Sequence, residues 1–578
     1  MKHYYLLLII LLVPAQGFIY SQNITPALLS VPPDAPCGES KSIYSRQNGI
    51  NTNDNYNYID INQIMMYVSN NGNGSHDPKT YNGGLYWPGG YKATQTAVFE
   101  DGLIWGGIIN GDTCVNGNTH RQGLQAGKIL SDGKADDPGL PKYRVYKIRR
   151  DWETLPAGAE RDQLQKDYNE WPVSDGAPWV DVNKDGIYTA GVDRPHFIGD
   201  EVLWYVANDM DSVRTLRTYG KKPIGLEEQC TVYGFNKSDS LGNMVFKKYK
   251  IINKGKNTIK DMYLAWWSDT DLGYAADDYA GCDTLLSMGY CYNGSSSDKT
   301  YGNPAPAVGY ALLQGPKVTG TASDSALFSL KWVKGYKNLP MTSFVFYACG
   351  NTYYCEPSSG TPIGSIQYYR NFQGLMSLDG KPYIDPITKL ATKFVLSGDP
   401  VSGKGWYEGR GWPQGLLSGD RGLLMTSGSF NMAPGDTQEV TIAVMLGRGS
   451  STVNSVSVIK SMAAYAQSFF RSPAAITNVD HEILPPCGYS LEQNYPNPFN
   501  PSTTIEYEIP AGGSVTLVIY DAAGRMVKTL NEEYSSAGRY NAAWDGTDNE
   551  GKKLSSGIYI YQLKTKKYIS AKKMIMLK

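Results

Sequence analysis

The chain has 578 residues, 54 of them basic and 55 acidic, so its formal net charge is −1. Such a balance provides no field to attract a polyanion, and we expect no nucleic-acid partner. Only 19% of the residues are charged, against 62 glycines and 43 tyrosines. This composition is typical of an all-β extracellular protein with many turns.

The N-terminus has the three parts of a secretory signal peptide. Lys2 supplies a positive charge, residues 6–13 form an apolar core, and small residues follow, with cleavage sites after Ala15 or near Ser21. The core is short for a membrane-spanning helix, although a membrane anchor is the alternative interpretation. We therefore predict a signal peptide at 1–22, no integral membrane segment after its removal, and a secreted or cell-surface location.

Residues 23–448 are predicted to form a large all-β region of sandwich or jelly-roll-like sheets. This region could consist of one unit or of two subdomains. The alternating segments Val245–Asn253 and Glu439–Leu446 are examples of its strands, separated by turn residues. A helix is predicted at Ser451–Arg471 from its helical spacing of apolar residues, and a shorter one near Glu160–Asn169.

A helix and connector at 449–490 separate this region from a last module at 491–578. About seven short strands in some ninety residues predict an immunoglobulin-like β-sandwich with Trp544 in its core. The module opens with YPNPFNP, whose prolines lack amide donors and favour extended backbone. We expect this stiff stretch to hold the module away from what precedes it.

The late lysines of the module have two interpretations, a recognition surface or protection of an edge strand against aggregation. They are Lys564, Lys566, Lys567, Lys572 and Lys573.

YPNPFNPSTTIEY, VTLVIYDAAGRMVKTL and WDGTDNEGKKLSSGIYIYQL, followed by a basic strand, resemble the C-terminal sorting domain (type A) of type IX secretion. The same pattern resembles the immunoglobulin-like domain of flagellar hook-capping proteins. The resemblance covers roughly 491–578 and implies export across the bacterial outer membrane by the type IX secretion machinery. Upstream segments such as GLIWGG are similar to parts of large secreted β-rich proteins that carry this domain, and they imply no activity.

Eight cysteines in an exported protein favour disulfides. Two pairs are close enough in the sequence for local bridges, namely Cys282 with Cys291 and Cys349 with Cys355.

The segment DVNKDGIYTAGVD, at 181–193, resembles the start of a calcium loop, because oxygen ligands alternate and a glycine follows at the sixth position. The closing acid comes one place late and no flanking helices are evident, so an Asx-rich turn is the alternative. The candidate ligands are the side chains of Asp181, Asn183, Asp185 and Asp193 and the carbonyl group of Ile187.

A second acidic segment follows Trp266 and Trp267. Five close carboxylates repel one another unless they are solvated, protonated or bound to a cation, and calcium is again one explanation. A solvated loop and a catalytic acid/base pair are the alternatives. The five are Asp269, Asp271, Asp277, Asp278 and Asp283.

Four tryptophans are candidates for sugar stacking. Neighbours on a strand point to opposite faces, so one of Trp266 and Trp267 could be exposed and stack on a sugar, but core packing is the favoured interpretation for this pair. Trp406 and Trp412 lie in a Gly-rich stretch and are expected to be more exposed, with core packing as the alternative.

The sequence thus predicts an exported protein whose cargo is non-enzymatic, adhesive or structural, with structural calcium in its loops. The alternative is a secreted glycan-active protein that binds a surface polysaccharide or hydrolyses glycans with paired carboxylates.

Overall fold

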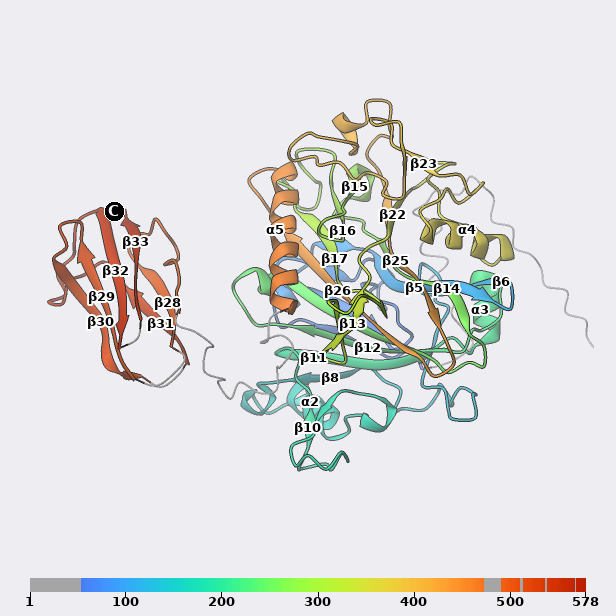
Figure 1. Ribbon diagram of the computed structural model, residues 1–578, viewed down its shortest axis with the longest axis horizontal. Helices are drawn as coiled ribbons and strands as arrows, with labels where there is room; N and C mark the ends of the chain where they lie inside the picture. The colour runs from blue at the N-terminus through green and yellow to red at the C-terminus, as the bar shows by residue number, and fades with distance from the viewer. Residues whose placement is uncertain (1–52, 472–489, 510–512, 536–537, 567, 578) are drawn as a thin grey trace, which may run out of the picture.

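The structure, a computed structural model, describes residues 53–471, 490–509, 513–535, 538–566 and 568–577 (Figure 1). The predicted signal peptide, Cys37, Cys487 and Lys567 lie outside these residues. No described helix is long and apolar enough to cross a membrane.

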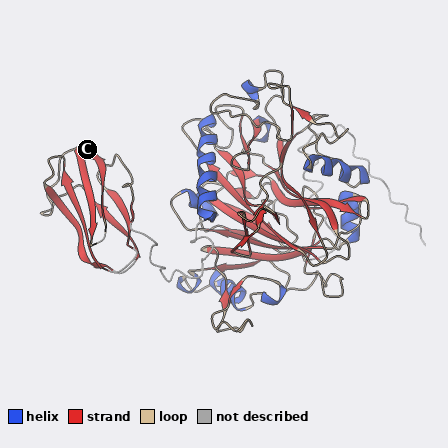
Figure 2. Cartoon of the chain, viewed as in Figure 1, coloured by secondary structure: helices blue, strands red, loops and turns tan. Residues whose placement is uncertain are grey.

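The main body is built on two antiparallel sheets (Figure 2). The nine-stranded sheet has the order β15 (Asp278–Asp283), β16 (Met288–Asn293), β17 (Ala307–Gln314), β26 (Thr437–Gly447), β13 (Met244–Asn253), β12 (Leu226–Gly234), β11 (Glu201–Asn208) and β7 (Gln125–Ala126), with β8 (Tyr146–Arg149) also beside β11. The five-stranded sheet has the order β22 (Ser343–Ala348), β25 (Arg421–Met432), β14 (Ile259–Asp269), β5 (Glu100–Ile109) and β6 (Asp112–Gly117).

Smaller elements surround these sheets. They are the four-stranded sheet β1 (Tyr56–Ile59), β2 (Met65–Ser69), β3 (Leu85–Tyr86) and β4 (Thr96–Val98), and the strand pairs β9 (Trp179–Val180) with β10 (Arg194–Pro195), β18 (Lys317–Thr319) with β21 (Tyr336–Asn338), β19 (Ser325–Phe328) with β20 (Lys331–Lys334), and β23 (Tyr383–Ile384) with β24 (Ala391–Thr392).

The described helices lie on the outside of the sheets. They are α2 (Ala159–Asn169), α3 (Ser212–Tyr219), α4 (Pro362–Phe372) and α5 (Thr452–Arg471). The two helices predicted from the sequence are α2 and α5, each displaced by one residue at its start. In Figure 1, α5 runs along β16, β17 and β26, and α4 lies at the opposite side of the body.

One hydrophobic cluster fills the space between the two sheets, where Tyr249 of β13 meets Trp266 of β14 with ring centroids 6.0 Å apart. A second cluster lies between the nine-stranded sheet and α5, which contributes residues such as Ile459 and Ala463. The nine-stranded sheet is therefore covered on both faces, and strands such as β11 and β12 are buried along their whole length.

Neither predicted local disulfide forms. Cys282 and Cys291 lie on the adjacent strands β15 and β16, but their register pairs Cys282 with Gly289, and Cys291 with Ala280. Such a diagonal relation keeps the two sulfur atoms too far apart for a bond. Both residues are free thiols, and Cys355 is free as well.

The C-terminal module has seven described strands in two sheets, as an immunoglobulin-like sandwich requires. One sheet contains β27 (Ser490–Leu491), β28 (Thr503–Ile509) and β31 (Gly538–Trp544), and the other contains β30 (Met526–Ser535), β29 (Gly513–Asp521), β32 (Gly557–Thr565) and β33 (Ile569–Met576). Its hydrophobic cluster draws only on residues 491–576 and includes Trp544, as predicted.

The proline-rich stretch, which the sequence predicted to hold the module away from what precedes it, packs into the module itself. Phe499 is only 2% exposed, and its ring lies 5.5 Å from that of Trp544. The stretch also runs along the edge strand β33, because the Phe499 N–H donates to the carbonyl of Ile575 and the Leu577 N–H donates to the carbonyl of Phe499. Asn497 accepts a further bond from the Ile575 N–H at 2.9 Å. The motif is thus an integral part of the module.

Replacing Phe499 with alanine should destabilise this module alone, by about 3–5 kcal/mol, because a large buried ring is lost from a small core. Calorimetry of the full chain should show the unfolding transition of the module at a lower temperature and that of the main body unchanged. Tyr495→Ala is the matched control, since Tyr495 belongs to the same stretch but is 82% exposed. Equal effects of the two substitutions would contradict a core role for the motif.

Candidate functional site

The loop between β9 and β10 brings three of its predicted carboxylates together. Asp181, Asp185 and Asp193 each place one oxygen within 4.8 Å of the others. Backbone amides hold them there: the Gly186 N–H donates to Asp181 at 2.8 Å, and the Val182 N–H donates to Asp193 at 2.8 Å. Asp193 therefore joins the group despite its late position in the sequence.

The other two predicted ligand residues of this loop, Asn183 and Ile187, form hydrogen bonds with Asp185. The amide nitrogen of Asn183 donates to Asp185 at 2.8 Å, and its oxygen accepts from the Asp185 N–H at 3.2 Å. Ile187 donates its own N–H to Asp185 at 2.7 Å. This geometry fits an Asx-rich turn, and its three convergent carboxylates also suit a hard cation such as calcium.

The second acidic segment separates into different environments. Asp269, at the end of β14, and Asp271 lie with Asp420, whose carboxylate completes a group within 4.8 Å. The sequence analysis missed Asp420 because it lies some 150 residues away, directly before β25, and only the pairing of β14 with β25 brings it near.

The remaining three acids of that segment do not join this group. Asp278 is fully buried and accepts from the Leu272 N–H at 2.9 Å, and its burial raises the pKa of the carboxyl well above its ordinary value. Asp283 forms an ion pair of 3.1 Å with Lys460 of α5. Asp277 accepts from the Asn293 side chain at 2.8 Å.

A cluster that the sequence did not reveal surrounds His120. Its Nδ1 lies 3.4 Å from Glu100, and its Nε2 lies 3.6 Å from Asp269 and 3.7 Å from Glu356. Its ring meets the edge of Trp267 at a centroid distance of 4.6 Å, and the Trp267 indole donates to Glu356 at 2.5 Å. These residues come from β5, β14 and two loops, so no local motif could indicate them.

The three carboxylates around His120 determine the charge of its imidazole ring. Burial lowers the pKa of an imidazole, but Glu356, Asp269 and Glu100 outweigh it and raise the pKa of His120 to about 9. Burial opposes the ionised form of Glu100, yet its contacts with His120 and His76 hold the pKa of this carboxyl below its usual range. At neutral pH the imidazole is therefore protonated, and it cannot serve as a general base.

The tryptophans considered for sugar stacking are not surface aromatics. Trp266 and Trp267 are 1% and 0% exposed, because α4 and loops cover the outer face of the five-stranded sheet as well. Trp406 is buried against Trp412, and Trp412 is half-buried on the main core. None of the four offers an open ring for sugar stacking.

Residues 501–568 match the family model of the FlgD Ig-like domain. No curated protein sequence matches the chain. The C-terminal module is thus an immunoglobulin-like domain similar to that of FlgD, and the match does not extend to the main body.

Among solved structures, a polysaccharide lyase is 8% identical, with 61% of this chain and 34% of that chain covered and a TM-score of 0.17. Dimeric latent PorU from Porphyromonas gingivalis is 12% identical, with 65% and 31% covered and a TM-score of 0.14. The adhesin domain of Epf from Streptococcus pyogenes is 8% identical, with 64% and 87% covered and a TM-score of 0.12. This chain spans about a third of the first two, and scores this low carry no argument about its fold or function.

The His120 cluster predicts a pH-dependent contribution to stability. The folded pKa is about 9 and the unfolded pKa about 6.5, so the contribution is complete below pH 6.5 and is lost as the pH rises towards 9. Relative to His120→Gln, the native chain should gain about 3 kcal/mol at pH 5.5 and much less at pH 9, measured by urea unfolding.

Lys134→Gln provides the control for this measurement, because the Lys134 side chain is 81% exposed. Its effect on the free energy of unfolding should be small at both pH values. A His120→Gln effect of the same size at pH 5.5 and pH 9 would refute the ion-pair assignment.

Proposed function

We propose that this protein is exported by a type IX secretion system, with the module at 490–577 as its sorting signal. The observation that carries the proposal is the self-contained core of this module, which among the described residues draws on none before Leu491. A sorting signal has to remain recognisable on different cargoes, and an independent core meets that requirement.

The surface of the module is consistent with recognition. Lys564, Lys566 and Lys573 are exposed, and β33, which carries Lys573, is the last strand of its sheet. Because residues 497–499 already pair with this edge, the lysines are not required as its sole protection. This favours the recognition role among the two interpretations of the lysines.

The main body is proposed to act outside the cell as a non-enzymatic adhesive or structural protein. Asp269 and Glu356, the acids near Trp267, form ion pairs with His120, and the four candidate tryptophans pack on the main core. Glycan binding is the second candidate function, favoured by a cavity of about 820 Å³ in the main body. Only one carboxylate, that of Asp175, lines this cavity, whereas glycoside hydrolysis needs a facing pair.

Calcium is proposed to stabilise two loops of the main body. Asp181, Asp185 and Asp193 would bind one ion, and Asp269, Asp271 and Asp420 a second. Carboxylate oxygens suit this cation, which would relieve the repulsion between carboxylates less than 5 Å apart.

Deleting residues 491–578 should retain the protein in the cell envelope of a bacterium with a type IX system, while the main body stays folded. Immunoblots of medium and envelope fractions, with limited proteolysis of the retained protein, measure both effects. Phe499→Ala should also reduce export, as the deletion does, and Tyr495→Ala should leave export unchanged. A truncated protein that still reaches the medium would exclude the sorting role.

Removing calcium with a chelator should lower the melting temperature of the full chain by several degrees, because an ion at about 100-fold its Kd contributes roughly 2.7 kcal/mol. The shift should shrink in Asp185→Asn and in Asp420→Asn, one for each loop. Asp132→Asn, at an exposed turn, is the control and should keep the full shift. Identical melting curves with chelator and with calcium would reject metal binding.

A further inference from the structure

A cavity of about 820 Å³, open to solvent and lined by both polar and apolar residues, lies at one end of the nine-stranded sheet, on the face that carries α5 further along. Gln229 of β12 and Ile252 of β13 contribute to its lining from the sheet. Residues 128–131, after β7, and 173–176, a short 3-10 turn with the residue that follows it, line it from outside the sheet. All of these segments belong to the main body.

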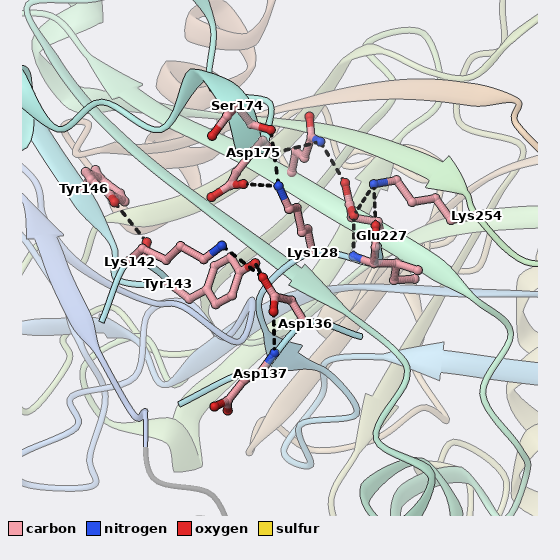
Figure 3. A network of polar contacts seen from close by, with 12 residues as sticks. Lys128, Asp136, Asp137, Lys142, Tyr143, Tyr146, Ser174, Asp175, Glu227 and Lys254 are labelled. Carbon is pink, nitrogen blue, oxygen red and sulfur yellow. Dashed lines mark hydrogen bonds and ion pairs between the residues drawn. The ribbon is translucent and has the colours of Figure 1, made fainter. Parts of the chain in front are cut away.

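Two lysines of the lining, Lys128 and Lys254, each form an ion pair (Figure 3). Lys128 Nζ lies 2.5 Å from Asp175 Oδ1, and Lys254 Nζ lies 2.6 Å from Glu227 Oε2. Glu227 is fully buried beneath Lys254, while both lysine side chains are partly exposed, at 24% and 30%. Each positive charge at the cavity is therefore balanced by a carboxylate.

The ion pairs keep unused hydrogen-bonding capacity. Lys128 also donates to the carbonyl of Ser174 at 3.4 Å, and Lys254 to that of Ile129 at 3.0 Å. An ammonium group has three donors, so one remains on each lysine. The hydrogen bonds of the Asp175 side chain use only Oδ1, as Figure 3 also shows, which leaves Oδ2 as an acceptor.

Gln229 connects the two ion pairs through hydrogen bonds of its side-chain amide. Its amide nitrogen donates to Glu227 at 2.9 Å and to the carbonyl of Asp175 at 3.3 Å. Gly176 permits this approach, because a Cβ there would lie 2.3–2.5 Å from the Gln229 amide and the backbone has φ +110°. The lining is thus held in place before any ligand arrives, which reduces the entropy lost on binding.

We propose that this cavity binds a neutral, hydroxyl-rich ligand, namely a sugar unit of an extracellular polysaccharide. A hydroxyl group both donates and accepts, so adjacent hydroxyls can donate to Asp175 and accept from Lys128 or Lys254. The balanced charge favours neutral sugars over polyanions. None of the described residues that line the cavity is aromatic, so hydrogen bonds replace ring stacking as the means of recognition.

This inference rests on the glycan-binding candidate named under the proposed function, for which it names the class of sugar and the residues that bind it. Export and sugar binding can fail separately: export is followed by the location of the protein, whereas sugar binding is followed with purified full-length protein.

The test is calorimetric titration of the full chain with neutral hexasaccharides of the cello-, malto-, manno- and xylo- series, and with oligogalacturonate as the acidic probe. At least one neutral series should bind, and more tightly than the acidic probe. Ser131→Trp, which fills the cavity from an exposed position of its lining, should weaken this binding at least tenfold.

The double variant Lys128→Met/Asp175→Asn removes one ion pair without leaving a buried charge alone, and it should also weaken binding at least tenfold. Lys134→Met, an exposed neighbour outside the lining, should bind as the native chain does, and melting curves confirm that each variant is folded. Binding by none of the neutral sugars, preference for the acidic probe, or unchanged binding by folded Ser131→Trp would each overturn the proposal.

Discussion

The main body depends on one constraint, which is that its largest sheet is covered on both faces. Every residue of β11 and β12 is buried, including charged and polar ones. Buried charges are tolerated only when they are paired, and the structure pairs them across elements, as in Lys147 with Glu201 and Lys247 with Asp101. Burial, partly offset by Lys147, raises the pKa of Glu201 to about 7. The cavity described above also has ion pairs, and its two lysine side chains remain within reach of solvent.

The elements that the sequence predicted well depend on short-range patterns. The strand predicted at Val245–Asn253 differs from β13 by one residue, and the helix predicted at Ser451–Arg471 differs from α5 by one residue. The all-β class and the C-terminal immunoglobulin-like sandwich are likewise confirmed, because alternating strands, turn residues and the FlgD-like motif are local signals.

What the sequence could not reveal depends on covering layers and on distant partners. Alternation allowed one exposed residue in the pair Trp266 and Trp267, but this holds only for a sheet with one open face. Asp420 reaches Asp269 and Asp271 through strand pairing, and the carboxylates around His120 come from segments far apart in the chain. Periodicity and motif spacing describe only nearby residues, so they could not predict either group. The convergence of Asp181, Asp185 and Asp193 within one loop could be anticipated, because a short turn by itself brings alternate residues to one side.

The proline-rich motif covers two parts of the C-terminal module at the same time, its hydrophobic core and the edge of its strand β33. The Phe499 ring closes the core beside Trp544, and its backbone occupies the edge of β33. This stretch stands at the start of the module, so tension applied through the preceding chain loads it before most of the strands. Detaching this stretch would expose apolar core residues and an unpaired strand edge in one step.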